Sequence, residues 1–90
     1  MNTYSKAYLN ADLHCHSVVS DGTLTPEVLA ARAATNGVEL WALTDHDEIG
    51  GQVRAAAAAA AHGMAYLTGV EISVTFANEV ARLCELTGAD

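Results

Sequence analysis

The protein has 90 residues, of which 51% are hydrophobic and 17% are charged, and its formal net charge is −7. This composition is typical of a soluble globular protein, and the lack of a basic cluster argues against stable binding to nucleic acid or to an anionic membrane. Charged residues and histidines interrupt every apolar run before it reaches the length of a membrane span. Residues 1–8 also lack the apolar core of a signal peptide, so we expect a cytoplasmic protein.

The chain alternates between strand-like and helix-like segments. In chain order we expect a strand at 9–16, a loop at 18–24, a helix at 25–36, a strand at 38–44, a helix at 52–62, a strand at 64–70 and a helical segment at 78–85. Thr25 is a hydroxyl N-cap followed by proline at the first helical position, and Gly37 is a typical helix terminator. This order, with its short connections, predicts an α/β domain with parallel strands and helical crossovers.

The length of the chain limits the architecture that this pattern can complete. A parallel barrel takes about 250 residues, and a sheet of three strands alone would leave its edges exposed. No linker divides the chain, so we expect residues 1–90 to be the N-terminal portion of a single domain.

The first predicted strand carries a concentration of side chains that bind metals. Because side chains alternate along a strand, Asp12, His14 and His16 share one face, and Leu13 and Cys15 take the other. Neutral imidazole and carboxylate are ligands that zinc, manganese and iron accept. The chain's two cysteines do not make a disulfide framework, and we interpret the one in this strand as a small buried residue.

Polar side chains also follow the other two predicted strands, at the edge where α/β folds collect their binding groups. The residues concerned are His14 and His16 after the first strand, Asp21 in the following loop, Asp45, His46 and Asp47 after the second strand, and Glu71 after the third. Each has an ordinary alternative: Glu71 could be a solvated loop acid, and Asp45 or Asp47 could cap the turn into the next helix. His62 lies beside a helix C-terminus, where a cation is favoured, and is left out of the site.

Taken together, these residues predict a catalytic metal centre. Imidazole and carboxylate without paired cysteines suit manganese, iron or zinc in a catalytic site better than a structural zinc. The sequence has no serine elbow, no GxGxxG and no P-loop. We therefore expect no side-chain nucleophile, and a metal-bound water or hydroxide in its place.

Four stretches of the chain resemble the first motifs of the PHP (polymerase and histidinol phosphatase) family of phosphoesterases. They are residues 12–17 (DLHCHS), 20–23 (SDGT), 43–47 (LTDHD) and 69–73 (GVEIS), in the family's order. The resemblance is strongest to the branch that contains 3′,5′-nucleoside bisphosphate phosphatases. It implies the N-terminal part of a distorted (β/α)7 barrel, similar to a TIM barrel, with a centre of two or three metal ions, often Mn²⁺, with Fe²⁺ or Zn²⁺ as alternatives.

The resemblance also implies a role for each site residue. Metal ligands would be His14, His16, Asp21, His46 and Glu71, and supporting residues that orient ligands would be Asp12 and Asp47. In this arrangement His14, His16 and Glu71 hold one ion, and Glu71 bridges to a second. Family members carry further histidines and an Asp-x-His pair beyond these motifs, whereas residues 74–90 contain no histidine. We therefore expect these 90 residues alone to bind metal weakly.

The activity implied by the resemblance is hydrolysis of a phosphate monoester. The expected substrate is a small phosphorylated nucleotide that loses the 3′-phosphate of a 3′,5′-bisphosphate, as when adenosine 3′,5′-bisphosphate gives AMP and phosphate. The alternatives are a histidinol phosphate phosphatase, an amidohydrolase-type hydrolase and a non-catalytic PHP module. No membrane partner is expected, and the sequence does not predict an oligomeric state.

Overall fold

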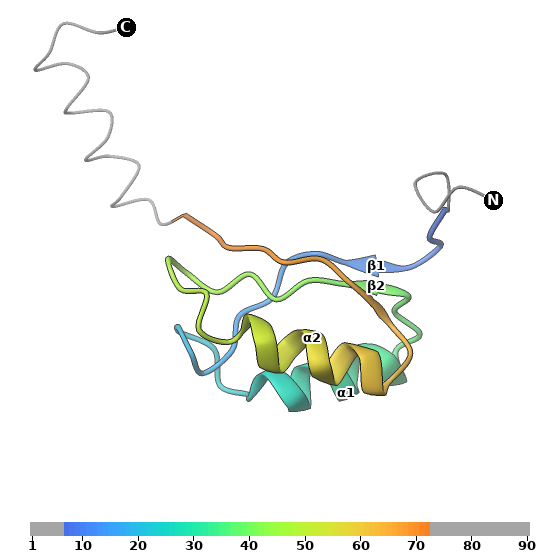
Figure 1. The fold of residues 1–90 in the computed structure, drawn as a ribbon, viewed down its shortest axis with the longest axis horizontal. Helices are drawn as coiled ribbons and strands as arrows, with labels where there is room; N and C mark the ends of the chain where they lie inside the picture. The colour runs from blue at the N-terminus through green and yellow to red at the C-terminus, as the bar shows by residue number, and fades with distance from the viewer. Residues whose placement is uncertain (1–6, 73–90) are drawn as a thin grey trace, which may run out of the picture.

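The computed structural model describes residues 7–72, which form a three-stranded parallel sheet with two helices on one face (Figure 1). The elements are β1 (Ala11–Asp12), α1 (Pro26–Thr35), β2 (Leu40–Trp41), α2 (Gln52–Ala61) and β3 (Ala65–Tyr66). The strand order is β1-β2-β3, so each helix crosses between neighbouring parallel strands. The predicted α/β class is confirmed, and the helical segment expected at 78–85 lies outside the described residues.

The regular strands are shorter than predicted, although the extended segments stay adjacent beyond them. Ala11 pairs with Leu40, and Leu40 pairs with Ala65. Further on, the Thr44 amide still donates to the Cys15 carbonyl at 2.9 Å. The Cys15 amide, however, donates to the Thr44 hydroxyl at 3.2 Å. Side chains thus take over hydrogen bonds that a continuous ladder would use, and this shortens the strands.

Both helices begin and end within a residue of the predicted positions. The Thr25 hydroxyl accepts a hydrogen bond from the Val28 amide at 3.2 Å, as expected of an N-cap. Helix α1 is followed by Gly37 with φ of +77°, and α2 by Gly63 with φ of +73°. Glycine suits both places because a left-handed backbone is unfavourable for other residues.

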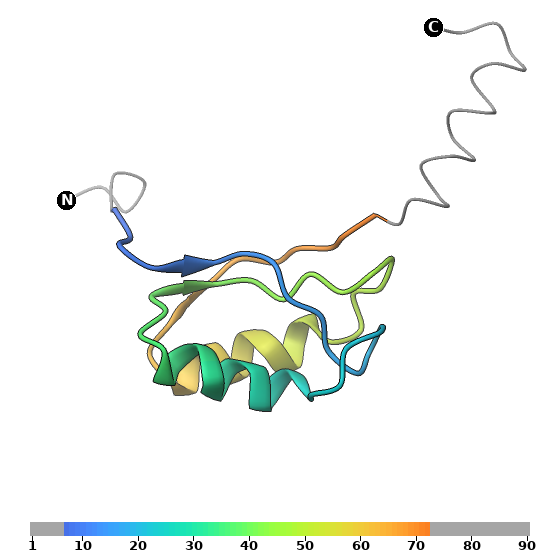
Figure 2. The ribbon, with the colours of Figure 1, turned by 180° about the vertical axis from the view of Figure 1, so that it is seen from behind.

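The core lies between the middle of the sheet and the two helices (Figure 2). Trp41 and Leu43 are its largest fully buried apolar side chains. The alanine-rich helix contributes Ala55 and Ala59, both 0% exposed and four residues apart, so that they share one helix face. Small side chains on this face let the helix lie close to the sheet, where it contacts β3, as predicted from the alanine run.

The first segment follows the predicted alternation of faces only in part. Cys15 is half-buried and packs against the core, and its thiol donates to the Ala42 carbonyl at 3.5 Å. Leu13, expected on the same face, is 48% exposed. Strand alternation ends early here because the regular part of β1 stops at Asp12.

The outer surfaces of α1 and α2 are joined by one ion pair. Arg54 donates two hydrogen bonds to the Glu27 carboxylate, at 2.9 and 2.7 Å. Both side chains are about half exposed, so solvent screens the pair. Neither helix is long and apolar enough to cross a membrane, and these are the helices of residues 7–72.

Candidate metal centre

The five predicted ligands lie close together at the carboxyl edge of the sheet. We call this part of the structure the ligand edge. They are His14, His16, Asp21, His46 and Glu71. An isolated parallel bridge pairs His46 with Glu71 beyond the named strands. It is held by the Glu71 amide, which donates to the Asp45 carbonyl at 3.1 Å, and by the Asp47 amide, which donates to the Glu71 carbonyl at 3.0 Å. Backbone pairing therefore fixes the second and third segments against each other at the site itself.

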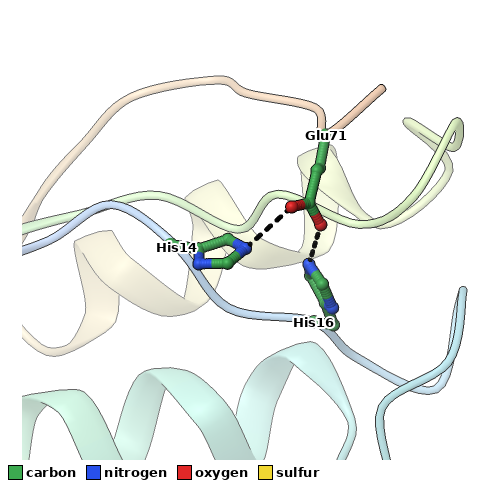
Figure 3. A group of neighbouring side chains, drawn as sticks. All are labelled: His14, His16 and Glu71. Carbon is green, nitrogen blue, oxygen red and sulfur yellow. Dashed lines mark hydrogen bonds and ion pairs between the residues drawn. The ribbon is translucent and has the colours of Figure 1, made fainter. Parts of the chain in front are cut away.

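The Glu71 carboxylate lies at the centre of the first group of ligands. Its Oε1 lies 3.2 Å from His14 Nε2, and its Oε2 lies 2.6 Å from His16 Nε2. Figure 3 shows the two imidazoles approaching the carboxylate from the same segment. His46 Nδ1 lies 3.2 Å from the same Oε2. One ligand atom from each of His14, His16 and Glu71 lies within 4.8 Å of the others.

Asp21 organises a second group from the loop between β1 and α1. Its Oδ1 lies 3.1 Å from His16 Nδ1, and its Oδ2 lies 3.3 Å from His46 Nε2. The ligand atoms of His16, Asp21 and His46 also lie within 4.8 Å of one another. His16 belongs to both groups, because its two ring nitrogens face different carboxylates.

The donor set fits divalent metal ions. Three of its buried atoms have no hydrogen-bond partner in the part of the chain that the structure describes: His16 Nε2, His46 Nδ1 and Glu71 Oε2. Buried polar atoms are nearly always satisfied, so three such atoms at one point require an explanation. Each can offer a lone pair, and imidazole with carboxylate is a set that manganese, iron and zinc accept. A bound cation would satisfy all three atoms at once.

The charge state of Glu71 suits a ligand. Burial alone would raise the pKa of the Glu71 carboxyl, but the hydrogen bond from His14 and the charges of His46, His14 and His16 together hold that pKa below its usual value. Burial raises the pKa of the Cys15 thiol instead, which keeps the sulfur protonated at neutral pH. This agrees with the interpretation of Cys15 as a packing residue.

The two predicted supporting residues lie next to ligands, and their role stays a prediction. Asp12 Oδ1 accepts a hydrogen bond from the His14 amide at 3.3 Å. Asp47 has φ of +49°, and its amide is the donor to Glu71 described above. Both contacts hold the backbone that carries a ligand.

Asp45 was placed at this edge from the sequence, but its buried role was not predicted. It is 0% exposed, and it accepts hydrogen bonds from Ser17 and Ser20. A signal was available, because Trp41, Leu43 and Asp45 alternate along one extended segment and therefore share the buried face. The alternative that Asp45 merely caps a turn does not describe these contacts with the preceding loop.

The loop that carries Asp21 is tight at Gly22. The Ser17 carbonyl accepts hydrogen bonds from the Ser20 amide at 3.1 Å and from the Gly22 amide at 2.8 Å. A Cβ at Gly22 would lie 2.1 Å from the His16 carbonyl oxygen, far inside van der Waals contact. Glycine is therefore the residue that lets this loop close.

Comparison with known proteins decides the family. The family model of the PHP domain matches residues 12–87. The chain belongs to the PHP domain family. The match extends beyond the four PHP motifs of the sequence, whose last one ends at residue 73.

Relatives of this PHP chain have several names. A 3′,5′-nucleoside bisphosphate phosphatase from Chromobacterium violaceum is 49% identical over 77 residues, which are 86% of this chain and 27% of that protein. A 5′-3′ exoribonuclease from Haemophilus influenzae is 51% identical over 65 residues, which are 72% of this chain and 24% of that protein. A solved structure described as an amidohydrolase from Chromobacterium violaceum, with bound sulfate and no metal, superposes with a TM-score of 0.70 at 57% identity. That match covers 72% of this chain and 23% of the other. The chain thus spans about a quarter of the length of these relatives.

Proposed function

We propose that this PHP protein is a metal-dependent phosphoesterase that removes the 3′-phosphate from a 3′,5′-bisphosphate nucleotide. The observation that carries the proposal is the meeting of three buried donor atoms, from His16, His46 and Glu71, which face one another at the ligand edge without forming a hydrogen bond of ordinary geometry. The 49% identity with a 3′,5′-nucleoside bisphosphate phosphatase supports the choice of substrate. Manganese is the ion that we propose.

The side chains would divide the work between two ion positions. His14, His16 and Glu71 would hold one ion, and Asp21 with His46 would contribute to a further one. When bound, divalent ions supply positive charge for phosphate oxygens and lower the pKa of a coordinated water. The protein's own part is to present these donors in the correct protonation state.

Asp21 and Glu71 act on His16 from opposite sides of its ring. The Asp21 carboxylate faces His16 Nδ1 at 3.1 Å, and the Glu71 carboxylate faces Nε2 at 2.6 Å. The two carboxylates together fix the orientation of the imidazole, a role that residues beside a metal-binding histidine commonly have. The lowered pKa of Glu71 keeps its carboxylate anionic at neutral pH.

The charge of the ligand edge favours an anionic substrate only after cations are bound. Carboxylates without cations would repel a phosphate ester, and bound ions reverse the sign of the local field. The 49% identity with a 3′,5′-nucleoside bisphosphate phosphatase supports a phosphate ester over a neutral amide as the substrate class.

A second candidate is exonucleolytic cleavage of RNA, because the Haemophilus influenzae exoribonuclease is 51% identical to the matched part of this chain. Both reactions break a phosphate ester, so the same ligands could serve either of them. Histidinol phosphate hydrolysis, amide hydrolysis and a non-catalytic role remain the alternatives from the sequence.

Activity of the full-length protein separates these candidates. The purified protein is stripped with a chelator, reloaded with Mn²⁺, Fe²⁺ or Zn²⁺, and offered adenosine 3′,5′-bisphosphate, a 5′-phosphorylated oligoribonucleotide, histidinol phosphate and a simple amide. We expect phosphate release from the bisphosphate with Mn²⁺ and none from the stripped control. Preferential shortening of the oligoribonucleotide would establish the second candidate. Failure to hydrolyse any phosphate ester with all three ions would overturn the phosphoesterase proposal.

A further inference from the structure

Asp45 combines complete burial with a negative charge. Among the acidic and basic residues of the described range 7–72, Asp45 is the one that is fully buried, at 0% exposure. Its Oδ1 accepts hydrogen bonds from the Ser17 amide at 2.6 Å and the Ser20 hydroxyl at 2.7 Å, and its Oδ2 accepts one from the Ser17 hydroxyl at 2.8 Å. A buried carboxylate without a cationic partner is tolerated only where hydrogen bonds satisfy it. All three donors come from the loop between β1 and α1.

Hydrogen bonds within the loop connect these serines to the backbone around Asp21. Ser17 also accepts a hydrogen bond from the Val19 amide through its hydroxyl, at 3.1 Å. Its carbonyl closes the turn by accepting from Ser20 and Gly22. Asp21 lies between these two residues, so the backbone on both sides of it is fixed. The Ser20 hydroxyl makes the last contact with Asp45 before the chain reaches the ligand.

The other side of Asp45 is equally tied to the ligand edge. Its carbonyl accepts the Glu71 amide at 3.1 Å, and the next residue is His46. Through its side chain and backbone, Asp45 therefore connects the three segments that supply Asp21, His46 and Glu71. Asp21 Oδ2 and His46 Nε2, which lie on two of these segments, are 3.3 Å apart.

We propose that Asp45 is a positioning residue that holds the Asp21 loop against His46 and so builds the second group of metal ligands. This inference rests on the metal centre proposed above. A carboxylate suits the task because its two oxygens only accept, and the three groups facing it can all donate. With asparagine at this position, the side-chain NH₂ would face one of the serine donors. Two donors would then oppose each other, and a hydrogen bond would be lost.

The link between Asp45 and the loop can be cut at either serine. In the full-length protein, Ser20→Ala removes a hydroxyl that reaches Asp45 and also lies 3.5 Å from Asp21 Oδ1, and Ser20→Thr keeps one. Ser17→Ala removes a hydroxyl that reaches Asp45 Oδ2 and no ligand, so it should weaken the same class of site, and wild-type binding by Ser17→Ala would overturn the role of Asp45. Thr35→Ala is the matched control, because it removes a hydroxyl on α1 that donates only locally, to the Ala31 carbonyl at 3.0 Å. Mn²⁺ binding to each metal-free protein is measured by calorimetric titration, and its thermal unfolding is followed without metal.

We expect Ser20→Ala to weaken one class of Mn²⁺ site by about 10–100-fold, the range found when a residue that orients a ligand is lost. The remaining class should bind as in the wild type, Ser20→Thr should restore the weakened class, and Thr35→Ala should bind as the wild type does. The Tm of metal-free Ser20→Ala should fall below that of Thr35→Ala, because the buried Asp45 carboxylate loses a hydrogen bond, and wild-type binding at the remaining class of site shows that the fold is retained. Asp45→Asn should weaken the same class, and Ser20→Ala keeps the test decisive if Asp45→Asn does not fold.

Three results from the Ser20 variants would also overturn the proposal. Ser20→Ala could bind every ion with wild-type affinity, all classes of site could weaken together with the Tm, or Ser20→Thr could remain as weak as Ser20→Ala. The second of these would show a general structural role in place of a positioning one. Wild-type protein that binds no Mn²⁺, Fe²⁺ or Zn²⁺ would overturn the proposed metal centre as well, so failure of the function is distinguishable from failure of this inference alone.

Discussion

Between Leu43 and His46 one extended segment passes from the helix-covered core to the ligand edge. On the core side, apolar side chains are almost fully removed from water, among them Trp41, Leu43, Ala30, Ala55 and Ala59. On the other side, buried donor atoms lack partners and carboxylates gather beside histidines. The core side is packed by apolar contacts among the described residues, whereas the ligand edge presents lone pairs that a cation could satisfy. Substitutions in the core should therefore change the free energy of unfolding, and substitutions at the ligand edge should change the metal affinity.

The largest effect is expected from the histidine pair. The double variant His14→Ala, His16→Ala removes ligands from both groups and should abolish turnover and most metal binding. The core should survive, because neither imidazole packs in it. Metal content by mass spectrometry, activity and far-ultraviolet circular dichroism of the full-length protein check this. Retained turnover would contradict the assignment of the site.

Gly22→Ala should act on both sides at once. The added methyl meets the His16 carbonyl at 2.1 Å, so the loop must shift and Asp21 with it. We expect metal affinity to fall by about 10–100-fold and the free energy of unfolding to fall by about 1–3 kcal/mol. Mn²⁺ titration and urea unfolding measure the two effects.

Gly63→Ala is the control for this change. Its Cβ would meet nothing within 4 Å, but φ of +73° makes alanine unfavourable there. It should lower the free energy of unfolding by about 1 kcal/mol and leave metal affinity unchanged. Equal losses of metal affinity in both variants would contradict the steric account of Gly22.

Ala59→Leu tests the core side alone. Ala59 is 0% exposed, so a larger side chain must displace its neighbours. Overpacking of this kind should lower the free energy of unfolding by about 1–3 kcal/mol, with wild-type Mn²⁺ affinity in the folded protein. Ala57→Leu, at an exposed position of the same helix, is the matched control and should be nearly neutral. A loss of metal affinity in Ala59→Leu would show that the two sides are not separate.

The smallest effect is expected from Glu27→Gln on the outer surface. The hydrogen bond from Arg54 holds the pKa of the Glu27 carboxyl below its ordinary value of 4.5. A lowered pKa in the folded state stabilises the protein above the ordinary value, and this contribution is lost as the pH falls through the lowered one. Glu27→Gln should slightly reduce the Tm at pH 7 and leave it unchanged at a pH below both values, whereas a larger loss at the acidic pH would contradict this sign.

Local signals in the sequence were sufficient for the helices. The cap at Thr25 and the glycines at 37 and 63 fix helix ends through backbone geometry, which needs no tertiary information. A cluster of candidate ligands was predictable because parallel strands bring their carboxyl ends to one edge, whereas the choice of five residues within it came from the resemblance to PHP motifs. The structure brings all five predicted ligands together there.

The features that the sequence did not reveal all depend on contacts between distant segments. The strands are short because side chains such as Thr44 take hydrogen bonds from a neighbouring segment, which no local propensity encodes. Asp45 bonds to serines 25 and 28 positions earlier in the chain. An acid after a strand looks the same whether it caps a turn or is buried. Its partners become visible only when the loop is folded against it.

The His16 ring joins the two ligand groups as a rigid body. Its Nδ1 and Nε2 are fixed in one aromatic plane, so a rotation that improves the approach to Glu71 also changes the approach to Asp21. The plane of this ring is therefore set from two sides, by a carboxylate on the Asp21 loop and by one on the segment after β3. A ring held in this way keeps its orientation toward Glu71 when the Asp21 loop loses part of its support, so the first group can stay intact while the second loosens.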